Sequence, residues 1–289
     1  MLSTLFKHEM RATAKTFMWF YIAFIVIAVV NAIINPFAMG QFGYYAESGD
    51  AQMMNVPALL LPQAVRGIIM TLYSIAIGVI AILTFVIIIL RFYRNLLGDE
   101  GYLMMTLPVT REQHILAKLF AAVIWSVCTT VLIFLSFIMI LGSAGLLDQL
   151  AIGIQEILAE GAPLGRWVIQ FILLMIIGCV SGVLMLYAAM GIGPNLLKNR
   201  VGGSILAYII IYIASQFVMI GIIFGTVTTI LGNPMVAGAN ISAAGPAVSG
   251  AVITAVDTLV ISVMIGSAAI AVACWFITRY MLKRKLNLT

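Results

Sequence analysis

The feature that most constrains this chain is a series of six long apolar runs, none of which contains Lys, Arg, Asp or Glu. About 20 apolar residues form a helix long enough to cross the hydrocarbon core of a bilayer. The chain is 63% hydrophobic and only 9% charged, whereas a soluble domain carries about 25% charged residues. The runs are too long and too numerous for core helices of a soluble protein. The predicted spans are residues 17–34, 67–90, 119–141, 167–191, 204–231 and 258–278.

The positions of the basic residues orient these spans. With a cytoplasmic N-terminus, thirteen of the fifteen Lys and Arg residues fall on cytoplasmic segments, and only Arg66 and Arg166 fall outside. Basic residues stay preferentially on the cytoplasmic side, so both termini are predicted to be cytoplasmic. The basic clusters are short and lie next to the spans, which indicates contact with membrane lipid rather than with a nucleic acid. The predicted fold class is therefore an all-α, multi-pass integral membrane protein.

The N-terminal segment mixes apolar and basic residues before the first span. Leu2, Phe6 and Lys7 illustrate the mixture, and apolar residues recur at helical spacing. We expect residues 1–16 to form an interfacial amphipathic helix and residues 17–289 to form one six-span domain. A signal peptide is disfavoured because the following apolar run is too long and no small-residue cleavage site follows it.

The segments between spans differ in composition. Asn35-Pro36 and Gly193-Pro194 are predicted to end the first and fourth spans. The loop after the third span carries Asp148, Glu156 and Glu160, and we expect a polar cap without a chemical role there.

The stretch 201–256 contains no charged residue, and its middle, 232–246, is rich in Gly and Pro. We interpret the part of this stretch between the fifth and sixth spans as a re-entrant segment dipping into the outer leaflet, because buried irregular backbone is tolerated there. A plain outside loop is the alternative interpretation.

No residue pattern predicts catalysis or metal binding in this chain. A Gly-x-x-x-x-Gly-Lys-Ser/Thr phosphate loop is absent, and His8 and His114 do not have metal-ligand spacing. The odd number of cysteines argues against a disulfide framework. We therefore expect no catalytic, cofactor-binding or metal-binding residues. The three cysteines, which all lie in apolar stretches, are Cys128, Cys179 and Cys274.

The predicted spans also lack the charged residues that ion-coupled transporters carry near the midplane. Asp257, Arg66 and Arg166 all lie at predicted outer ends, where their side chains can reach water. Small residues at four-residue spacing permit close helix approach, either within the protomer or between protomers. The two pairs are Gly178 with Gly182 and Gly221 with Gly225.

The cytoplasmic segment between the second and third spans predicts a short amphipathic helix. Gly98 can end the preceding helix, and Asp99 or Glu100 can cap a new one. Pro108 then breaks that helix, and Thr110 with Gln113 forms a capping box for the helix of the third span. The short helix would present Tyr102, Leu103, Met104 and Leu107. Apolar side chains held away from the bilayer favour docking of a cytoplasmic partner, and a lipid-surface helix without a partner is the alternative.

The sequence of residues 97–109, Leu-Gly-Asp-Glu-Gly-Tyr-Leu-Met-Met-Thr-Leu-Pro-Val, resembles the segment after the second span of ABC-2 type permeases, especially those of Gram-positive bacteria. The resemblance also extends to the six-span plan. It implies a bacterial plasma-membrane location, a second permease protomer, identical or related, and two separate ABC ATPase subunits that bind ATP and Mg. It further implies that this segment is the coupling helix. The implied ATPase-coupling residues are Gly98, Asp99, Glu100, Gly101, Tyr102, Leu103, Leu107 and Pro108.

On this interpretation the chain is not an enzyme, because ATP hydrolysis belongs to the partner subunits. The expected function is the permease subunit of an ABC exporter that moves a hydrophobic or amphipathic substrate outward, such as a peptide, including an antimicrobial peptide, or a drug-like molecule. One alternative is a non-transporting sensor or anchor subunit docked to an ATPase. A secondary transporter or channel is a further alternative, and the lack of charges within the spans disfavours it.

Overall fold

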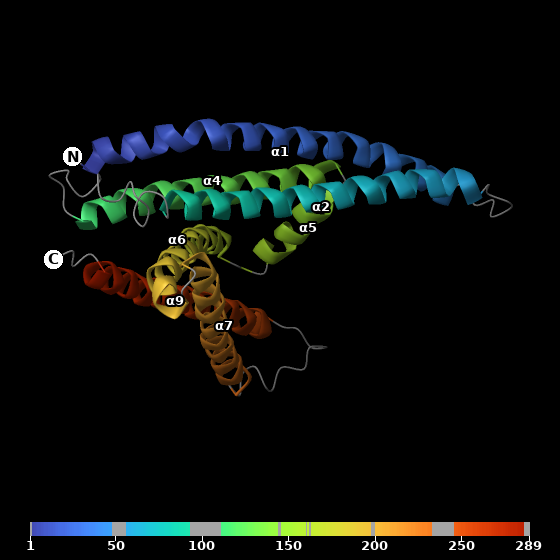
Figure 1. Ribbon diagram of the computed structural model, residues 1–289. Coiled ribbons are helices and arrows are strands. Elements are labelled where there is room, and N and C mark those ends of the chain that lie inside the picture. The colour runs from blue at the N-terminus through green and yellow to red at the C-terminus, as the bar shows by residue number, and fades with distance from the viewer. Residues whose placement is uncertain are drawn as a thin grey trace. The chain divides into compact units, whose positions relative to one another are not determined.

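The computed structural model describes residues 2–47, 56–92, 111–143, 146–159, 161, 163–197, 200–232 and 246–285 (Figure 1). These residues form helices, and no strand occurs among them. The helices in chain order are α1 (Leu2–Glu47), α2 (Val56–Phe92), α4 (Arg111–Ser143), α5 (Leu146–Ala159), α6 (Leu164–Leu196), α7 (Arg200–Leu231) and α9 (Pro246–Lys285).

Six of these helices are long and apolar enough to cross a membrane, as the sequence predicts. The candidate spans contain few charges and have mean hydropathies between 2.2 and 2.8. The prediction of an α-helical multi-pass membrane protein is therefore confirmed at this level. The spans are Phe6–Ile34, Gly67–Phe92, Leu116–Gly142, Leu164–Gly193, Gly202–Ile230 and Ile253–Met281.

The candidate spans end before Pro36 and Pro194, as predicted, but the helices themselves continue past both prolines. Helix α1 continues past Pro36 to Glu47, and α6 continues past Pro194 to Leu196. A proline removes one backbone hydrogen bond, but the remaining bonds can continue the helix on its far side. The end of an apolar run therefore marks the end of a span rather than the end of its helix.

Three other segments are helical: two continue into the helix of a neighbouring span, and one contains a helix of its own. Residues 2–16 and the first span belong to one helix, α1, and residues 247–256 belong to the same helix as the sixth span, α9. The loop expected as a polar cap after the third span instead contains the 14-residue helix α5. Periodic apolar residues drive helix formation there despite the acidic residues.

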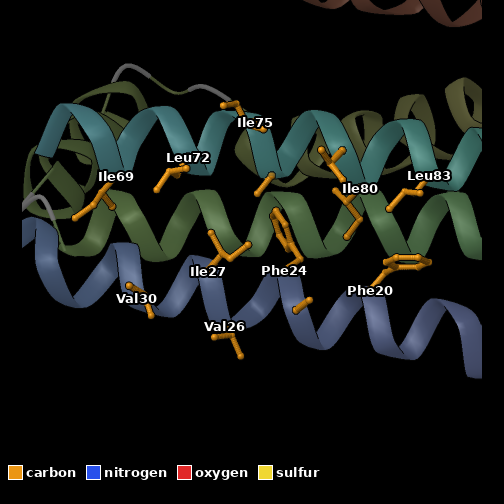
Figure 2. Close-up of a pocket in the computed structure, with 13 residues that line it drawn as sticks. Phe20, Phe24, Val26, Ile27, Val30, Ile69, Leu72, Ile75, Ile80 and Leu83 are labelled. Carbon is orange, nitrogen blue, oxygen red and sulfur yellow. The ribbon is translucent and has the colours of Figure 1, made fainter. Parts of the chain in front are cut away.

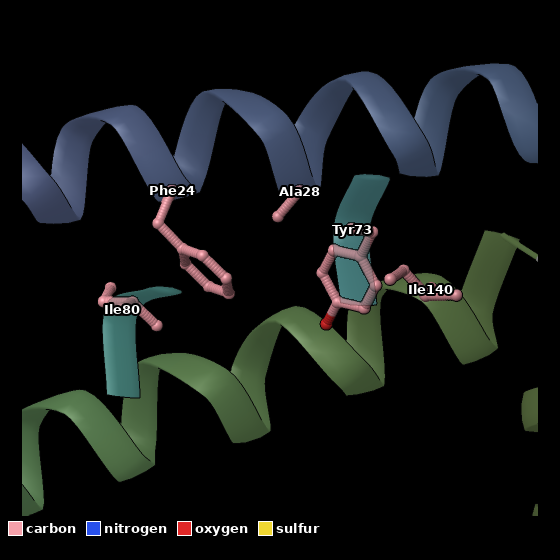
Figure 3. Packing of buried hydrophobic residues seen from close by; sticks show 5 residues of the cluster. All are labelled: Phe24, Ala28, Tyr73, Ile80 and Ile140. Carbon is pink, nitrogen blue, oxygen red and sulfur yellow. The ribbon is translucent and has the colours of Figure 1, made fainter. Parts of the chain in front are cut away.

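The chain divides into two compact units, of which the first comprises residues 1–88 and 124–155. Here α1, α2 and α4 lie side by side (Figure 1). Helix α1 is antiparallel to α2, as consecutive spans must be, and it is therefore parallel to α4, which contains the third span. The buried cluster joins all three helices (Figure 3) and consists of Phe24, Ala28, Tyr73, Ile80 and Ile140.

The second unit comprises residues 89–123 and 156–289. Helix α6 packs against both α7 and α9. The backbones of α6 and α7 approach most closely at Gly193 and Gly203, where a Cβ on either residue would overlap the opposite helix. At the start of the unit, the ring of Phe92 stacks on Tyr187 with centroids 4.1 Å apart. These aromatic side chains are both buried.

Candidate functional site

The predicted coupling segment lies outside the described residues. All eight predicted ATPase-coupling residues fall within 93–110, between the end of α2 and the start of α4. The described part of α4 begins at Arg111, and Thr110 of the predicted capping box lies outside the described residues. The middle of the predicted re-entrant segment, 233–245, also lies outside the described residues. The coupling residues are Gly98, Asp99, Glu100, Gly101, Tyr102, Leu103, Leu107 and Pro108.

The best-defined candidate site is the interface of α1, α2 and α4 in the first unit. One stripe of α1 is buried at intervals of three to seven residues, while its other faces expose large apolar side chains. In a membrane, those exposed faces are suited to lipid, because lipid tails are as apolar as Leu. The buried stripe comprises Glu9, Thr13, Phe17, Phe24, Ala28 and Asn31.

Trp125 of α4 fixes the first part of this interface. Its indole Nε1 donates a hydrogen bond to Thr13 Oγ1 at 2.8 Å. The ring of Phe17 stacks on the Trp125 ring, with centroids 4.4 Å apart and planes 8° from parallel. The tryptophan thus gains both apolar packing and a partner for its N–H group.

A ladder of hydroxyl groups continues the interface. The hydroxyls of Tyr21 and Thr129 are 2.8 Å apart, and those of Thr84 and Thr129 are 3.1 Å apart. Further along, the buried hydroxyls of Tyr73 and Ser136 are 2.7 Å apart. Such contacts between hydroxyl groups of different helices join membrane helices, since hydrocarbon itself offers a hydroxyl no partner. These neutral groups position helices, and they supply no acid–base chemistry.

Two apolar grooves flank α1 next to this ladder. The first, about 460 Å³, lies between α1 and α2, where Phe24 and Leu72 face the hollow (Figure 2). The second, about 530 Å³, lies between α1 and α4 and includes Ser136 and Cys128. Phe24 lines both grooves and separates them. Each has the volume of a pocket for a drug-sized molecule, for which about 300–1,000 Å³ is typical.

Two buried amide side chains have an unpaired carbonyl oxygen in the described part of the chain. Asn31 of α1 is 1% exposed, and its Nδ2 makes only a weak contact with Met70 Sδ at 3.9 Å. Neither Asn31 Oδ1 nor Gln170 Oε1 has a hydrogen-bond partner. An unpaired buried amide oxygen costs free energy, so each is a candidate contact for a further donor.

An ion pair joins α6 to α9 in the second unit. Arg166 pairs with Asp257 Oδ2, and the indole of Trp167 donates to Asp257 Oδ1 at 3.0 Å. The sequence placed Arg166 and Asp257 separately at outer ends of spans but did not pair them. The available signal was their shared position at the N-terminal ends of two spans that run in the same direction.

The sequence also did not reveal that two charged residues near the N-terminal ends of the first and third spans, Glu9 and Lys118, are buried, each 4% exposed. Among the described residues, no group of three His, Cys, Asp or Glu side chains could hold a metal ion. The three cysteines are free thiols in the structure. A Cβ at any of the four spaced glycines, Gly178, Gly182, Gly221 and Gly225, would meet open space.

Together these features define the class of the protein as a helical multi-pass membrane protein with apolar grooves and neutral polar contacts between its helices. Comparison of the chain with protein-family models, curated proteins and solved structures finds no match.

Proposed function

We propose that this chain is the transmembrane permease subunit of an ATP-driven exporter of the ABC-2 type, located in a bacterial plasma membrane. The observation that carries the proposal is the combination of six apolar spans with the segment 97–109 between the second and third of them. That segment resembles the coupling helix of ABC-2 permeases. The chain itself has no phosphate loop, so energy would come from two partner ATPase subunits that bind ATP and Mg.

The proposed topology places both termini and the coupling segment in the cytoplasm. Thirteen of fifteen basic residues support this orientation. In the same proposal, residues 1–16 lie near the cytoplasmic surface, and the Gly- and Pro-rich residues 232–246 form a re-entrant segment of the outer leaflet. A second permease protomer, identical or related, completes the transport pathway.

The proposed substrate is hydrophobic or amphipathic, such as a peptide or a drug-like molecule. The two grooves beside α1 support this class because apolar side chains dominate their linings. A sugar or an ion would require polar or charged groups to replace its water of hydration. The exposed thiol of Cys128 gives the groove between α1 and α4 one weakly polar group for orienting an amphipathic molecule.

The proposed mechanism is a population shift. ATP binding favours the closed form of the ATPase pair, and the coupling helix transmits that preference to the spans that flank it, α2 and α4. The hydroxyl ladder joins α1 to α4 and α4 to α2, which allows their movement to change the shape of the grooves beside α1.

The experiment is co-purification of the detergent-solubilised chain with the ATPase subunit encoded nearest to its gene. The wild-type protein is expected to retain the ATPase and to stimulate hydrolysis. A Glu100→Ala, Tyr102→Ala double variant is expected to insert normally but to lose both properties, whereas Gln149→Ala, on the predicted outer side, keeps them. A wild-type chain that recruits no ATPase would refute the proposal.

A flux measurement then separates transport from the alternative role of a sensor or anchor. Inside-out vesicles that contain the complex are expected to accumulate a hydrophobic fluorescent dye when ATP is added. Retained ATPase binding together with no ATP-dependent flux for dyes or peptides would favour the non-transporting role.

A further inference from the structure

Helix α5 is an unexpected element between two membrane spans. Its 14 residues, Leu146–Ala159, make it about 21 Å long at 1.5 Å per residue. The hydrocarbon core is about 30 Å thick, so α5 is too short to cross it. It must therefore lie beside a span, along a membrane surface or in water.

The side chains of α5 divide into two faces. Leu147, Leu150, Ile154 and Leu158 fall within an arc of about 80° at 100° per residue. All four are between 43% and 48% exposed. Gln149 and Ile152 lie on the opposite side and Gln155 lies at its edge, and only Ile152 of these three is apolar. A helix with one apolar stripe and one polar face is suited to a boundary between water and hydrocarbon.

Short connections hold both ends of α5 near spans. Helix α4 ends at Ser143, and a Cβ added to Gly142 would lie 2.9 Å from Leu147 Cδ1, so α5 starts packed against the end of α4. At the other end, the N–H group of Gly161 donates to the carbonyl of Leu158 at 3.0 Å. Gly161 has a φ of 82°, a left-handed conformation that ends the helix and turns the chain toward α6.

These connections place α5 at the outer surface of the membrane. The third span ends there and the fourth begins there, by the distribution of basic residues. Because both of its ends are held at one surface, the axis of α5 must run along that surface. Its exposed apolar stripe then requires an apolar medium within reach, and the acyl chains of the outer leaflet provide it.

We propose that α5 is an interfacial helix of the outer leaflet and that its apolar stripe inserts among lipid acyl chains. The helix contains two acidic residues and no basic one. Attraction to anionic headgroups therefore contributes nothing, and the partner is the apolar part of a lipid surface. Bound in this way, α5 fixes the depth of the outer end of α4, against which it packs. This inference rests on the membrane topology and does not depend on ATP-driven transport.

The test is spin-label accessibility in phosphatidylcholine proteoliposomes without any ATPase. Cys128, Cys179 and Cys274 are replaced by Ala, and single cysteines are introduced at positions of α5. Labels at Leu150, Ile154 and Leu158 are expected to collide severalfold more with oxygen, which concentrates in lipid, than with a water-soluble nickel chelate. Labels at Gln149 and Gln155 are expected to show the reverse, as matched controls on the same helix.

Two outcomes would overturn the inference. Immobilised labels on the stripe, shielded from both reagents, would mean that protein covers it. Equal access of the nickel chelate to all positions would mean that α5 lies in water. A second measurement replaces half of the lipid with phosphatidylglycerol. The labels are expected to stay at the same depth or to become shallower. Deeper labels in the anionic lipid would contradict the inference that apolar contact alone holds α5 in the membrane.

Discussion

Trp167 Nε1 and Asp257 Oδ1 lie 3.0 Å apart, although 90 residues separate the two positions in sequence. Arg166 occupies the other carboxylate oxygen, so both oxygens of a carboxylate that is almost fully buried are paired. Far along the same helices, a Cβ at Gly191 would lie 3.3 Å from Met281 Cβ. Helices α6 and α9 are therefore parallel and in contact at both ends, as the fourth and sixth spans should be.

Replacing Asp257 with Ala is expected to destabilise the protein by roughly 1–2 kcal/mol, because Trp167 and Arg166 both lose their acceptor. The value is modest because the Arg166 side chain is 56% exposed and water screens the pair. Thermal unfolding in detergent measures the effect. The control is Thr258→Ala, at a neighbouring hydroxyl that bonds only within its own helix. Equal stability of the Asp257 and Thr258 variants would contradict the structure.

A double-mutant cycle tests the ion pair separately. Arg166→Ala combined with Asp257→Ala is expected to cost less than the sum of the two single substitutions, because each single variant already removes their mutual interaction. Strict additivity would show that the two groups do not interact.

Two substitutions of Trp125 separate the contribution of ring stacking to stability and the contribution of the hydrogen bond. Trp125→Phe keeps an aromatic ring beside Phe17 but removes the hydrogen bond to Thr13, and it is expected to cost about 1 kcal/mol. Trp125→Ala removes both contacts and is expected to cost about 3–5 kcal/mol. The measurement is thermal unfolding of each variant. Trp19→Ala, at a position that is 68% exposed, serves as the control and is expected to change stability little.

The close approach of α6 and α7 predicts that Gly193→Ala or Gly203→Ala reduces the yield of folded protein, at a cost of about 1–3 kcal/mol or more. In either variant, the added methyl group meets the backbone of the opposite helix. The matched controls are Gly178→Ala and Gly182→Ala, whose methyl groups meet open space. Size-exclusion profiles in detergent compare the four variants. A monodisperse Gly203→Ala protein obtained at wild-type yield would disprove the close approach.

Filling the groove between α1 and α2 tests its proposed role in binding substrate. Ala76 lines this groove, and Ala76→Phe is expected to occupy it and to lower the affinity for a hydrophobic fluorescent probe severalfold. Ile82→Phe, on a well-exposed position outside the lining, is the control of equal final size. Fluorescence titration of detergent-solubilised protein measures probe binding. Unchanged affinity in Ala76→Phe would remove this groove from the proposed substrate pathway.

The sequence by itself determined the six spans, because the free energy of placing residues in hydrocarbon depends on length and composition, which can be counted directly. It also placed Arg166 and Asp257 at span ends, since charges there can reach water. It did not show that the helix continues past Pro36, nor that the loop after the third span contains α5. A single proline does not end a helix whose other backbone hydrogen bonds continue. Helix α5 carries acidic residues together with an apolar stripe, and an interpretation based on charge alone does not detect the stripe.

Only the tertiary structure decided which face of each span is buried and which side chains meet. A helix face that meets lipid and one that meets other helices are similarly apolar, so α1 is apolar on nearly all sides. Its sequence periodicity therefore does not separate the buried stripe, which runs between Glu9 and Asn31, and the lipid-facing residues. The pairings of Trp125 with Thr13 and of Asp257 with Trp167 depend on the rotation and crossing of helices far apart in the chain. Packing shape and hydrogen-bond geometry set that rotation, and they exist only once the helices have come together.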